Sequence, residues 1–263
     1  MLYPGLVSIT FRDLRPLEIV ALVQQAGGKS IEWGGDAHVP PGDEATARTV
    51  RQMTEDAGLM VSAYGSYYRL QPDDEEEHPF AAVLASAIEV GAPVIRLWAG
   101  SQSPDALTAE ERREIALRVR NIADQAAAEN IQIAFEYHSR TLTETTGATL
   151  EFMHAVNHAN VGLFWQPRNG WLLDENMIGL KRTADWITNV HCFHWWPTSK
   201  DRLPLVAGEA NWKHYLDDIA TLNGDHHVSI EFVRDGHSEQ YLRDARVLNQ
   251  WLAARHDSTT DPA

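Results

Sequence analysis

The sequence predicts a single (β/α)8 barrel, and three observations support this fold class. Eight short apolar segments, rich in Val, Ile and aromatic residues, begin 24 to 38 residues apart. Segments with helical spacing of apolar residues lie between them, and no linker divides the chain into halves. An open doubly wound sheet is the alternative, but that fold usually has a glycine-rich turn after its first strand. Here the first strand runs into "TFRDLRP", which contains no glycine.

The expected strands are short, and several lack the alternation of apolar and polar residues. Such strands are typical of a parallel sheet that is covered on both faces. The eight segments are 6–11, 30–33, 59–64, 93–98, 131–136, 161–166, 189–194 and 227–232.

The segments between the strands carry helix signals in order along the chain. The first, 12–28, offers Asp13 as a cap, Pro16 in the first turn and Gly27 as a stop. Segment 108–128 opens with a Thr108–Glu111 capping box. Segments 211–224 and 238–253 space their apolar residues on one helical face. We therefore expect one barrel domain over 1–255 and a disordered tail over 256–263.

Charge and cysteine content indicate which partners and which cellular compartment to expect. The 263 residues include 22 basic and 37 acidic side chains, a formal net charge of −15. Such a surface repels phosphate backbones and anionic lipid, so nucleic acid and membranes are not expected partners. The single cysteine, Cys192, allows no internal disulfide, and the N-terminus reads as a strand and not as a signal peptide. A cytoplasmic protein is expected.

Polar residues end the last four predicted strands: Glu136, Gln166, His194 and Glu231. In a barrel, the carboxyl ends of the strands meet at one mouth, where active sites lie. Two carboxylates, an amide and an imidazole that converge there need a positive charge between them. Each residue alone is as well explained as a solvated or ion-paired wall residue, but four on successive strands favour a divalent metal site.

The chain resembles the xylose isomerase-like barrels, the superfamily of ketose 3-epimerases, inosose dehydratases and endonuclease IV. The resemblance is carried by "IAFEYH", "VGLFWQPRNG", "VHCFHWWP", "LPLVAGEANW" and "SIEFV". In that family Glu, Asp, His and Glu from the fifth to eighth strands hold one divalent metal, and Glu136, His194 and Glu231 match. The sixth strand departs from it, with Gln166 and Asn169 where many relatives have Asp and His. The resemblance implies Mn²⁺, with Mg²⁺, Co²⁺ or Zn²⁺ as alternatives, and no organic cofactor.

The resemblance implies a metal-dependent isomerase or epimerase that moves a proton through an enediolate of a small sugar or polyol. Glu136 and Glu231 would be the catalytic pair. A lyase, either a dehydratase or a C-glycoside-cleaving enzyme, is the first alternative. A non-catalytic sugar-binding barrel with a metal site weakened by Gln166 is the second. A DNA-repair nuclease needs more metal ligands and a basic surface, which the net charge of −15 argues against.

Further residues near the strand ends are expected to bind substrate. Aromatic rings suit the C–H faces of a sugar, and cations after the seventh strand suit its oxygens. The expected substrate-binding residues are Trp33, His38, Tyr64, Trp98, His138, Asn169, Lys200 and Arg202. Segment 64–70 is the expected covering loop, and a homodimer or homotetramer is the expected assembly.

Overall fold

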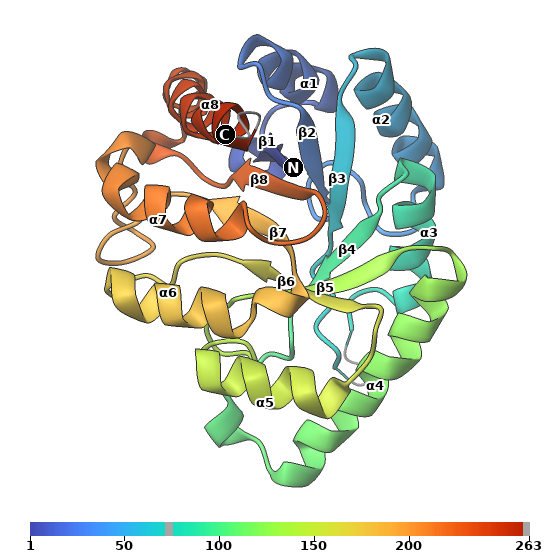
Figure 1. The fold of residues 1–263 in the computed structure, drawn as a ribbon. Helices are drawn as coiled ribbons and strands as arrows, with labels where there is room; N and C mark the ends of the chain where they lie inside the picture. Colours follow the sequence, from blue (N-terminus) through green and yellow to red (C-terminus); the bar gives the residue numbers. More distant parts are fainter. Residues whose placement is uncertain (72–75, 260–263) are drawn as a thin grey trace.

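The computed structural model describes residues 1–71 and 76–259, with side chains through residue 255. Eight parallel strands close into a barrel in the order of the chain (Figure 1). The barrel therefore confirms the predicted fold class. The strands are β1 (Leu2–Val7), β2 (Ser30–Gly34), β3 (Met60–Gly65), β4 (Val94–Leu97), β5 (Gln132–Glu136), β6 (Val161–Trp165), β7 (Ile187–Cys192) and β8 (His226–Ile230).

One long helix follows each strand and packs on the outside of the barrel (Figure 1). The helices are α1 (Pro16–Gln25), α2 (Glu44–Asp56), α3 (Phe80–Val90), α4 (Ala109–Ala128), α5 (Thr146–Val156), α6 (Leu173–Arg182), α7 (Glu209–Ile219) and α8 (Ser238–Thr259). The predicted Thr108–Glu111 capping box is present at the start of α4. None of the described helices combines the length and apolarity needed to cross a membrane.

The structure corrects several predicted boundaries. Residues 8–11, expected as the end of the first strand, form a 3-10 helix, so β1 lies earlier in the chain. Arg15, not Asp13, occupies the cap position of α1. Strand β7 begins and ends two residues before the predicted segment 189–194. Helix α8 continues through 256–259, which were expected in the tail, and residues 260–263 lie outside the described residues.

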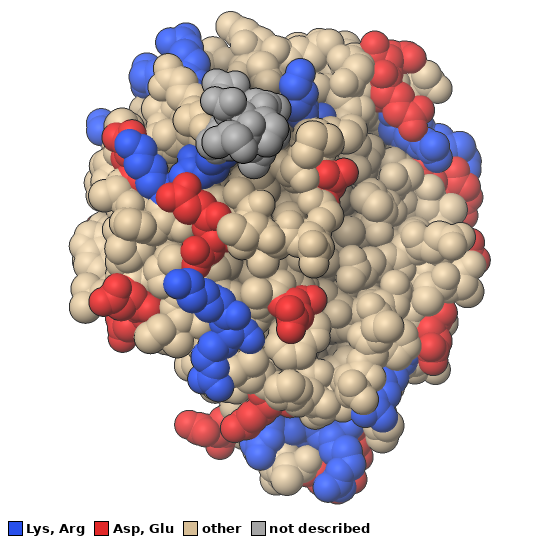
Figure 2. Space-filling view, in the orientation of Figure 1, with Lys and Arg blue, Asp and Glu red and all other residues tan. Residues whose placement is uncertain are grey.

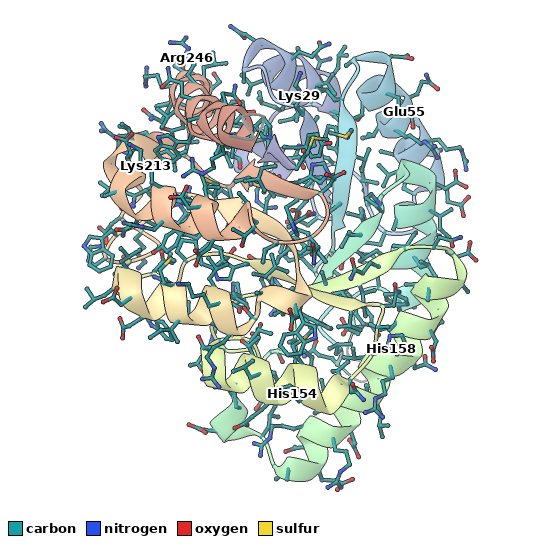
Figure 3. All side chains as sticks on the ribbon, viewed as in Figure 1. Lys29, Glu55, His154, His158, Lys213 and Arg246 are labelled. Atoms are coloured by element: carbon teal, nitrogen blue, oxygen red, sulfur yellow. The ribbon has the colours of Figure 1, made fainter. Side chains whose placement is uncertain are left out.

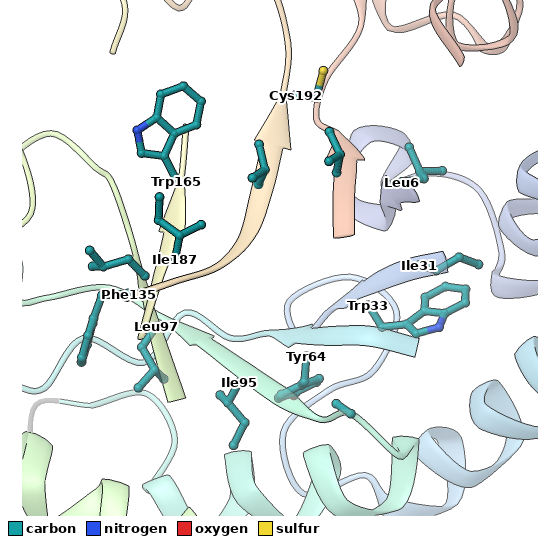
Figure 4. Packing of buried hydrophobic residues seen from close by; sticks show 14 of the residues in the cluster. Leu6, Ile31, Trp33, Tyr64, Ile95, Leu97, Phe135, Trp165, Ile187 and Cys192 are labelled. Atoms are coloured by element: carbon teal, nitrogen blue, oxygen red, sulfur yellow. The ribbon is translucent and has the colours of Figure 1, made fainter. Parts of the chain in front are cut away.

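Alternate strand residues separate the molecule into an outer and an inner layer. Large side chains on the outer face pack against the helices, among them Trp33, Tyr64 and Trp165 (Figure 4). A small inner cluster comprises Ala63, Val94, Ala134 and Phe164. Because neighbouring strand residues point to opposite faces, the residue beside each outward aromatic points into the barrel.

Charged side chains are scattered over the outside of the barrel (Figure 2). The labelled side chains in Figure 3, such as Glu55, Lys213 and Arg246, lie on the outer helices and the rim of the molecule. Acidic and basic residues are interspersed on the face shown in Figure 2. Charged groups inside the barrel are therefore the exception and call for a physical explanation.

Candidate metal centre and active-site cavity

A cavity of about 1190 Å³ opens at the carboxyl ends of the strands. This is the end of the barrel where the sequence places the active site. Eight of the predicted site residues line the cavity: Trp98, Glu136, His138, Gln166, Asn169, Lys200, Arg202 and Glu231. Tyr67, from the expected covering loop, also lines it.

Three buried side chains come together beside this cavity: Glu136 and Glu231, which line it, and His191, which is fully buried. Glu136 ends β5, His191 lies near the end of β7, and Glu231 directly follows β8. The Nδ1 atom of His191 lies 3.7 Å from Glu136 Oε1 and 3.7 Å from Glu231 Oε2. One ligand atom from each residue lies within 4.8 Å of the other two. A carboxylate, an imidazole and a second carboxylate at this spacing can share one divalent ion.

His194, the predicted histidine ligand, lies outside this group. Since β7 ends at Cys192, His194 follows the strand, and its half-buried ring packs beside Gly208. It lines a separate small cavity of about 30 Å³ together with Trp212. The alternation in β7 was the signal that could have found His191: Val190 and Cys192 pack outward with the core, so His191 points inward.

Gln166 directs its amide oxygen at the same group. Its Nε2 donates to the Tyr137 carbonyl oxygen at 2.7 Å. Its Oε1 lies 3.0 Å from His191 Nδ1. Because the carbonyl holds the amide nitrogen, Oε1 is the atom left to face the three ligand groups, as a fourth donor and the third oxygen.

A buried ion network supports the site from behind, and the sequence analysis missed it. Arg96, in the middle of β4, donates to Glu32 Oε1 at 2.6 Å and to Glu136 Oε2 at 2.5 Å. The other oxygen of Glu32 lies 2.9 Å from His191 Nε2. Trp98 Nε1 also donates to Glu136 Oε2, at 2.7 Å. An arginine inside the apolar segment "PVIRLW" was the signal in the sequence.

Burial and the neighbouring charges shift the pKa values of these residues strongly. Burial by itself would lower the pKa of His191, but Glu32 and Glu231 raise it to about 10. Burial raises the pKa of Glu231 to about 7, with a smaller rise from Glu136. Burial would also raise the pKa of Glu136, yet Arg96 holds it well below its usual range. Of these two carboxylates, Glu231 is thus the one whose pKa is raised.

A divalent cation fits the charges of this site. The three buried carboxylates of Glu32, Glu136 and Glu231 carry three negative charges when ionised, and Arg96 supplies one positive charge. With His191 neutral, as a metal ligand must be, two positive charges are needed for balance. The donor set of carboxylate oxygens, imidazole and amide oxygen suits Mn²⁺, Mg²⁺, Co²⁺ or Zn²⁺.

Three of the predicted substrate-binding residues do not line the cavity. Trp33 is buried and donates through Nε1 to Thr54 Oγ1 on α2. Tyr64 is buried and donates to the Val39 carbonyl oxygen. His38 is buried against Ser8 Oγ and the Leu14 carbonyl oxygen. Trp33 and Tyr64 point outward because the residues next to them in their strands point into the barrel.

Trp98 lines the cavity but has both ring faces covered. His138 stacks on one face, with ring centroids 4.1 Å apart, and the Arg69 guanidinium lies 4.2 Å from the ring centroid. Only the edge of the indole remains for a ligand. The stack in turn holds the His138 ring at the cavity wall.

The cavity is lined by several cations as well as by carboxylates, although the protein as a whole is acidic. Arg12, Lys200 and Arg202 all line it. Arg12 is paired with Asp36. Lys200 and Arg202 form no ion pair with any described residue within 4 Å. These two cations can bind an anionic group of a ligand.

Comparisons with known proteins agree with the fold. The chain is 26% identical to the 3-dehydroshikimate dehydratase of Bacillus anthracis, over 92% of this chain and 94% of that protein. The crystal structure of the probable 3-DHS dehydratase AsbF from Bacillus anthracis superposes with a TM-score of 0.77 at 19% identity, covering 95% and 99% of the two chains. The structure of L-ribulose 3-epimerase gives a TM-score of 0.64 at 16% identity and covers both chains completely.

The family assignment follows from the match of residues 20–251 to the model of the xylose isomerase-like TIM barrel family. That range spans seven of the eight strands and reaches into α8. This chain therefore belongs to the xylose isomerase-like TIM barrel family.

Proposed function

We propose that the protein is a divalent-metal-dependent lyase that removes water from a small hydroxylated keto acid. The observation that carries the proposal is the buried group Glu136–His191–Glu231, whose ligand atoms lie within 4.8 Å of one another and whose two glutamates line a large cavity. The similarity to 3-dehydroshikimate dehydratase, over nearly the full length of both chains, favours a dehydratase within the family's range of reactions.

Four residues would hold the metal: Glu136, His191 and Glu231, with Gln166 through its amide oxygen. This changes the sequence-based ligand set at one position, with His191 in place of His194. Mn²⁺ is the expected ion. A bound divalent ion would act as a Lewis acid that polarises a substrate carbonyl and makes the adjacent C–H more acidic.

His138 is suited to move the proton. Its Nδ1 lies 2.8 Å from the Ser139 carbonyl oxygen, which can only accept, so Nδ1 carries the hydrogen. The lone pair is then on Nε2, in a side chain that lines the cavity. We assign His138 Nε2 as the base that takes the C–H proton and then returns it to the departing hydroxyl, which leaves as water.

The two glutamates predicted as the catalytic pair have different surroundings. Glu136 Oε2 accepts from both Arg96 and Trp98, which makes it a weak base. The carboxylate of Glu231 accepts no hydrogen bond from any residue that the structure describes. Glu231 is therefore the carboxylate that would share proton transfer with His138.

Two cations that line the cavity support an acidic substrate. Lys200 and Arg202 have no ion pair with the part of the chain that the structure describes, and a substrate carboxylate would pair with both. Arg168, which also lines the cavity, is held instead by the carbonyl oxygens of Thr143 and Glu144. We also expect the protein to work in the cytoplasm as a homodimer or homotetramer.

The test is product analysis by mass spectrometry after incubation with Mn²⁺ and 3-dehydroshikimate. We expect a product lighter by one water molecule, and a His138→Asn variant that binds Mn²⁺ normally but turns over at least about 100-fold more slowly. A His214→Asn variant, altered on the exposed face of α7, is the control and should match the wild type. A metal-loaded protein that leaves this substrate unchanged would count against the proposed substrate.

An isomerase or epimerase acting on a sugar is the second proposed function. The full-length superposition on L-ribulose 3-epimerase and the two glutamates at one cavity favour it. Such an enzyme would leave the substrate mass unchanged in H₂O and would introduce deuterium next to the carbonyl in D₂O. A protein that binds sugars without either change would be the non-catalytic barrel.

A further inference from the structure

We propose that Glu32 is a positioning residue that fixes which nitrogen of His191 faces the metal. This inference rests on the proposed metal site. Glu32 lies on β2 and contacts Nε2 of His191, whereas Glu136 and Glu231 lie near Nδ1. Glu32 and His191 are almost completely buried, with 1% and 0% exposure.

The contacts of Glu32 determine the role of each of its oxygens. Oε1 accepts from Arg96 Nε at 2.6 Å, and Oε2 lies 2.9 Å from His191 Nε2. An ionised carboxylate can only accept hydrogen bonds, so Nε2 must carry a hydrogen. Nδ1 lies 3.0 Å from Gln166 Oε1, which can only accept, so Nδ1 donates a hydrogen there when no metal is bound. When a metal takes the place of that hydrogen, the lone pair of the neutral ring lies on Nδ1, the atom 3.7 Å from both Glu136 and Glu231. Glu32 thereby selects the tautomer that can bind a metal.

Arg96 fixes the positions of the Glu32 and Glu136 carboxylates relative to each other. The same guanidinium donates to both carboxylates, one behind His191 and one among the ligands. Gly65, at the end of β3, leaves room for this pair: a Cβ there would lie 2.7 Å from Glu32 Oε1 and 2.9 Å from Arg96 Nη2. The Glu32–Arg96 pair is thus held by the packing of three neighbouring strands, β2, β3 and β4.

A glutamine at position 32 cannot serve both partners. Its single oxygen must accept from Arg96, which has no acceptor, so its NH₂ group would face His191 Nε2. That arrangement places the lone pair on Nε2 and the hydrogen on Nδ1, where the metal should bind. We therefore expect Glu32→Gln to lower the affinity for Mn²⁺ by about 10- to 100-fold.

The first experiment is Mn²⁺ titration of the intact protein by calorimetry, with wild type, Glu32→Gln, Gly65→Ala and Asp244→Asn. Gly65→Ala should also weaken binding, because it displaces the Glu32–Arg96 pair. Asp244→Asn is the matched control: it removes a buried carboxylate that accepts from Leu205 N and Gln240 Nε2 on the α8 side of the molecule. It should keep the wild-type dissociation constant. Equal affinity of Glu32→Gln and wild type would overturn the inference.

The second readout is the ¹⁵N NMR spectrum of imidazole-labelled protein without metal, with the His191 signals assigned by their loss in His191→Gln. We expect a protonated Nε2 in the wild type and an unprotonated Nε2 in Glu32→Gln. An unprotonated Nε2 in the wild type would contradict the role of Glu32. Failure of the wild type to bind Mn²⁺ would instead contradict the proposed function, while the NMR result would still decide the role of Glu32.

Discussion

Gln166 shows how a single neutral side chain can set the strength of the metal site. Its Oε1 faces the ligand group while its Nε2 is held by the Tyr137 carbonyl oxygen. An amide oxygen carries no full charge, so the protein ligands hold a divalent ion with two carboxylates only. Metal affinity should therefore respond strongly to the charge at this position.

Replacing Gln166 with Asp should tighten Mn²⁺ binding by on the order of 1–3 kcal/mol, because a charged ligand replaces a neutral one. Titration calorimetry measures the change. Asn169→Asp is the matched control, since it adds the same charge to the wall of the same cavity at a residue outside the ligand group. An equal gain in both variants would mean that Gln166 acts only through the general field of the cavity.

At the residue scale, sequence reasoning reached the carboxylates but not the groups that balance them. Glu136 and Glu231 end strongly apolar segments, so their placement at the mouth followed from strand direction alone. The choice between His191 and His194 depended on the exact end of β7, which an apolar segment does not define. The Arg96–Glu32 pair joins β4 to β2, and a contact between residues 64 positions apart has no local signature.

At the element scale, the closure of the barrel depends on small residues where neighbouring strands lie close to each other. Gly5 of β1 pairs with Ser30 of β2 and with Ser229 of β8. A Cβ at Gly5 would lie 2.6 Å from the hydroxyl oxygens of both serines. Ser30 Oγ also lies 2.8 Å from His227 Nδ1, so it cannot move without loss of that hydrogen bond.

Gly5→Ala should therefore lower the free energy of unfolding by about 1–3 kcal/mol, as an overpacking substitution in the core. Gly147→Ala is the contrasting control: this glycine lies in the first turn of α5, and no atom lies within 4 Å of its added Cβ. The control should be unchanged or more stable by up to about 1 kcal/mol. Urea unfolding midpoints measure both, and equal midpoints would show that β1 can shift to admit the methyl group.

The order and type of the elements could be predicted, whereas several ends could not. Helix α4 begins at its Thr108 cap because the capping box is a local interaction. The first strand was placed too late because "SITF" is as apolar as a strand, yet residues 8–11 turn into a 3-10 helix. Ser8 there accepts a hydrogen bond from Gly34 N of β2, a tertiary contact that overrides local propensity.

At the scale of the whole molecule, the two ends of the barrel have different chemistry. The carboxyl ends hold the ion network, while the opposite end holds His227 of β8, packed near Tyr3 of β1. Burial lowers the pKa of His227 to about 4, despite the opposing attraction of Asp225. This histidine therefore links the stability of the closed barrel to pH without involving the candidate metal centre.

The sign of this linkage follows from the two pKa values. In the unfolded chain the histidine takes up a proton below about pH 6.5, whereas in the folded chain it does so only near pH 4. Above pH 6.5 both states are neutral and the linkage contributes nothing. As pH falls from about 6.5 to about 4, the unfolded state gains protons first, so stability is lost, by on the order of 2 kcal/mol for this partly exposed ring.

His227→Asn should remove this acid sensitivity, because asparagine can keep a hydrogen bond to Ser30 but does not titrate. We expect the variant to be less stable than the wild type at pH 7, from lost packing on Tyr3, and the gap to narrow steadily toward pH 4.5. Urea midpoints at half-unit pH steps measure the gap, and His214→Asn on the exposed face of α7 controls for a general loss of histidine. Other groups also titrate in this range, so the test is the difference in urea midpoint between the variant and the wild type at each pH. A difference that stays constant with pH would show that His227 is protonated equally in the folded and unfolded chains.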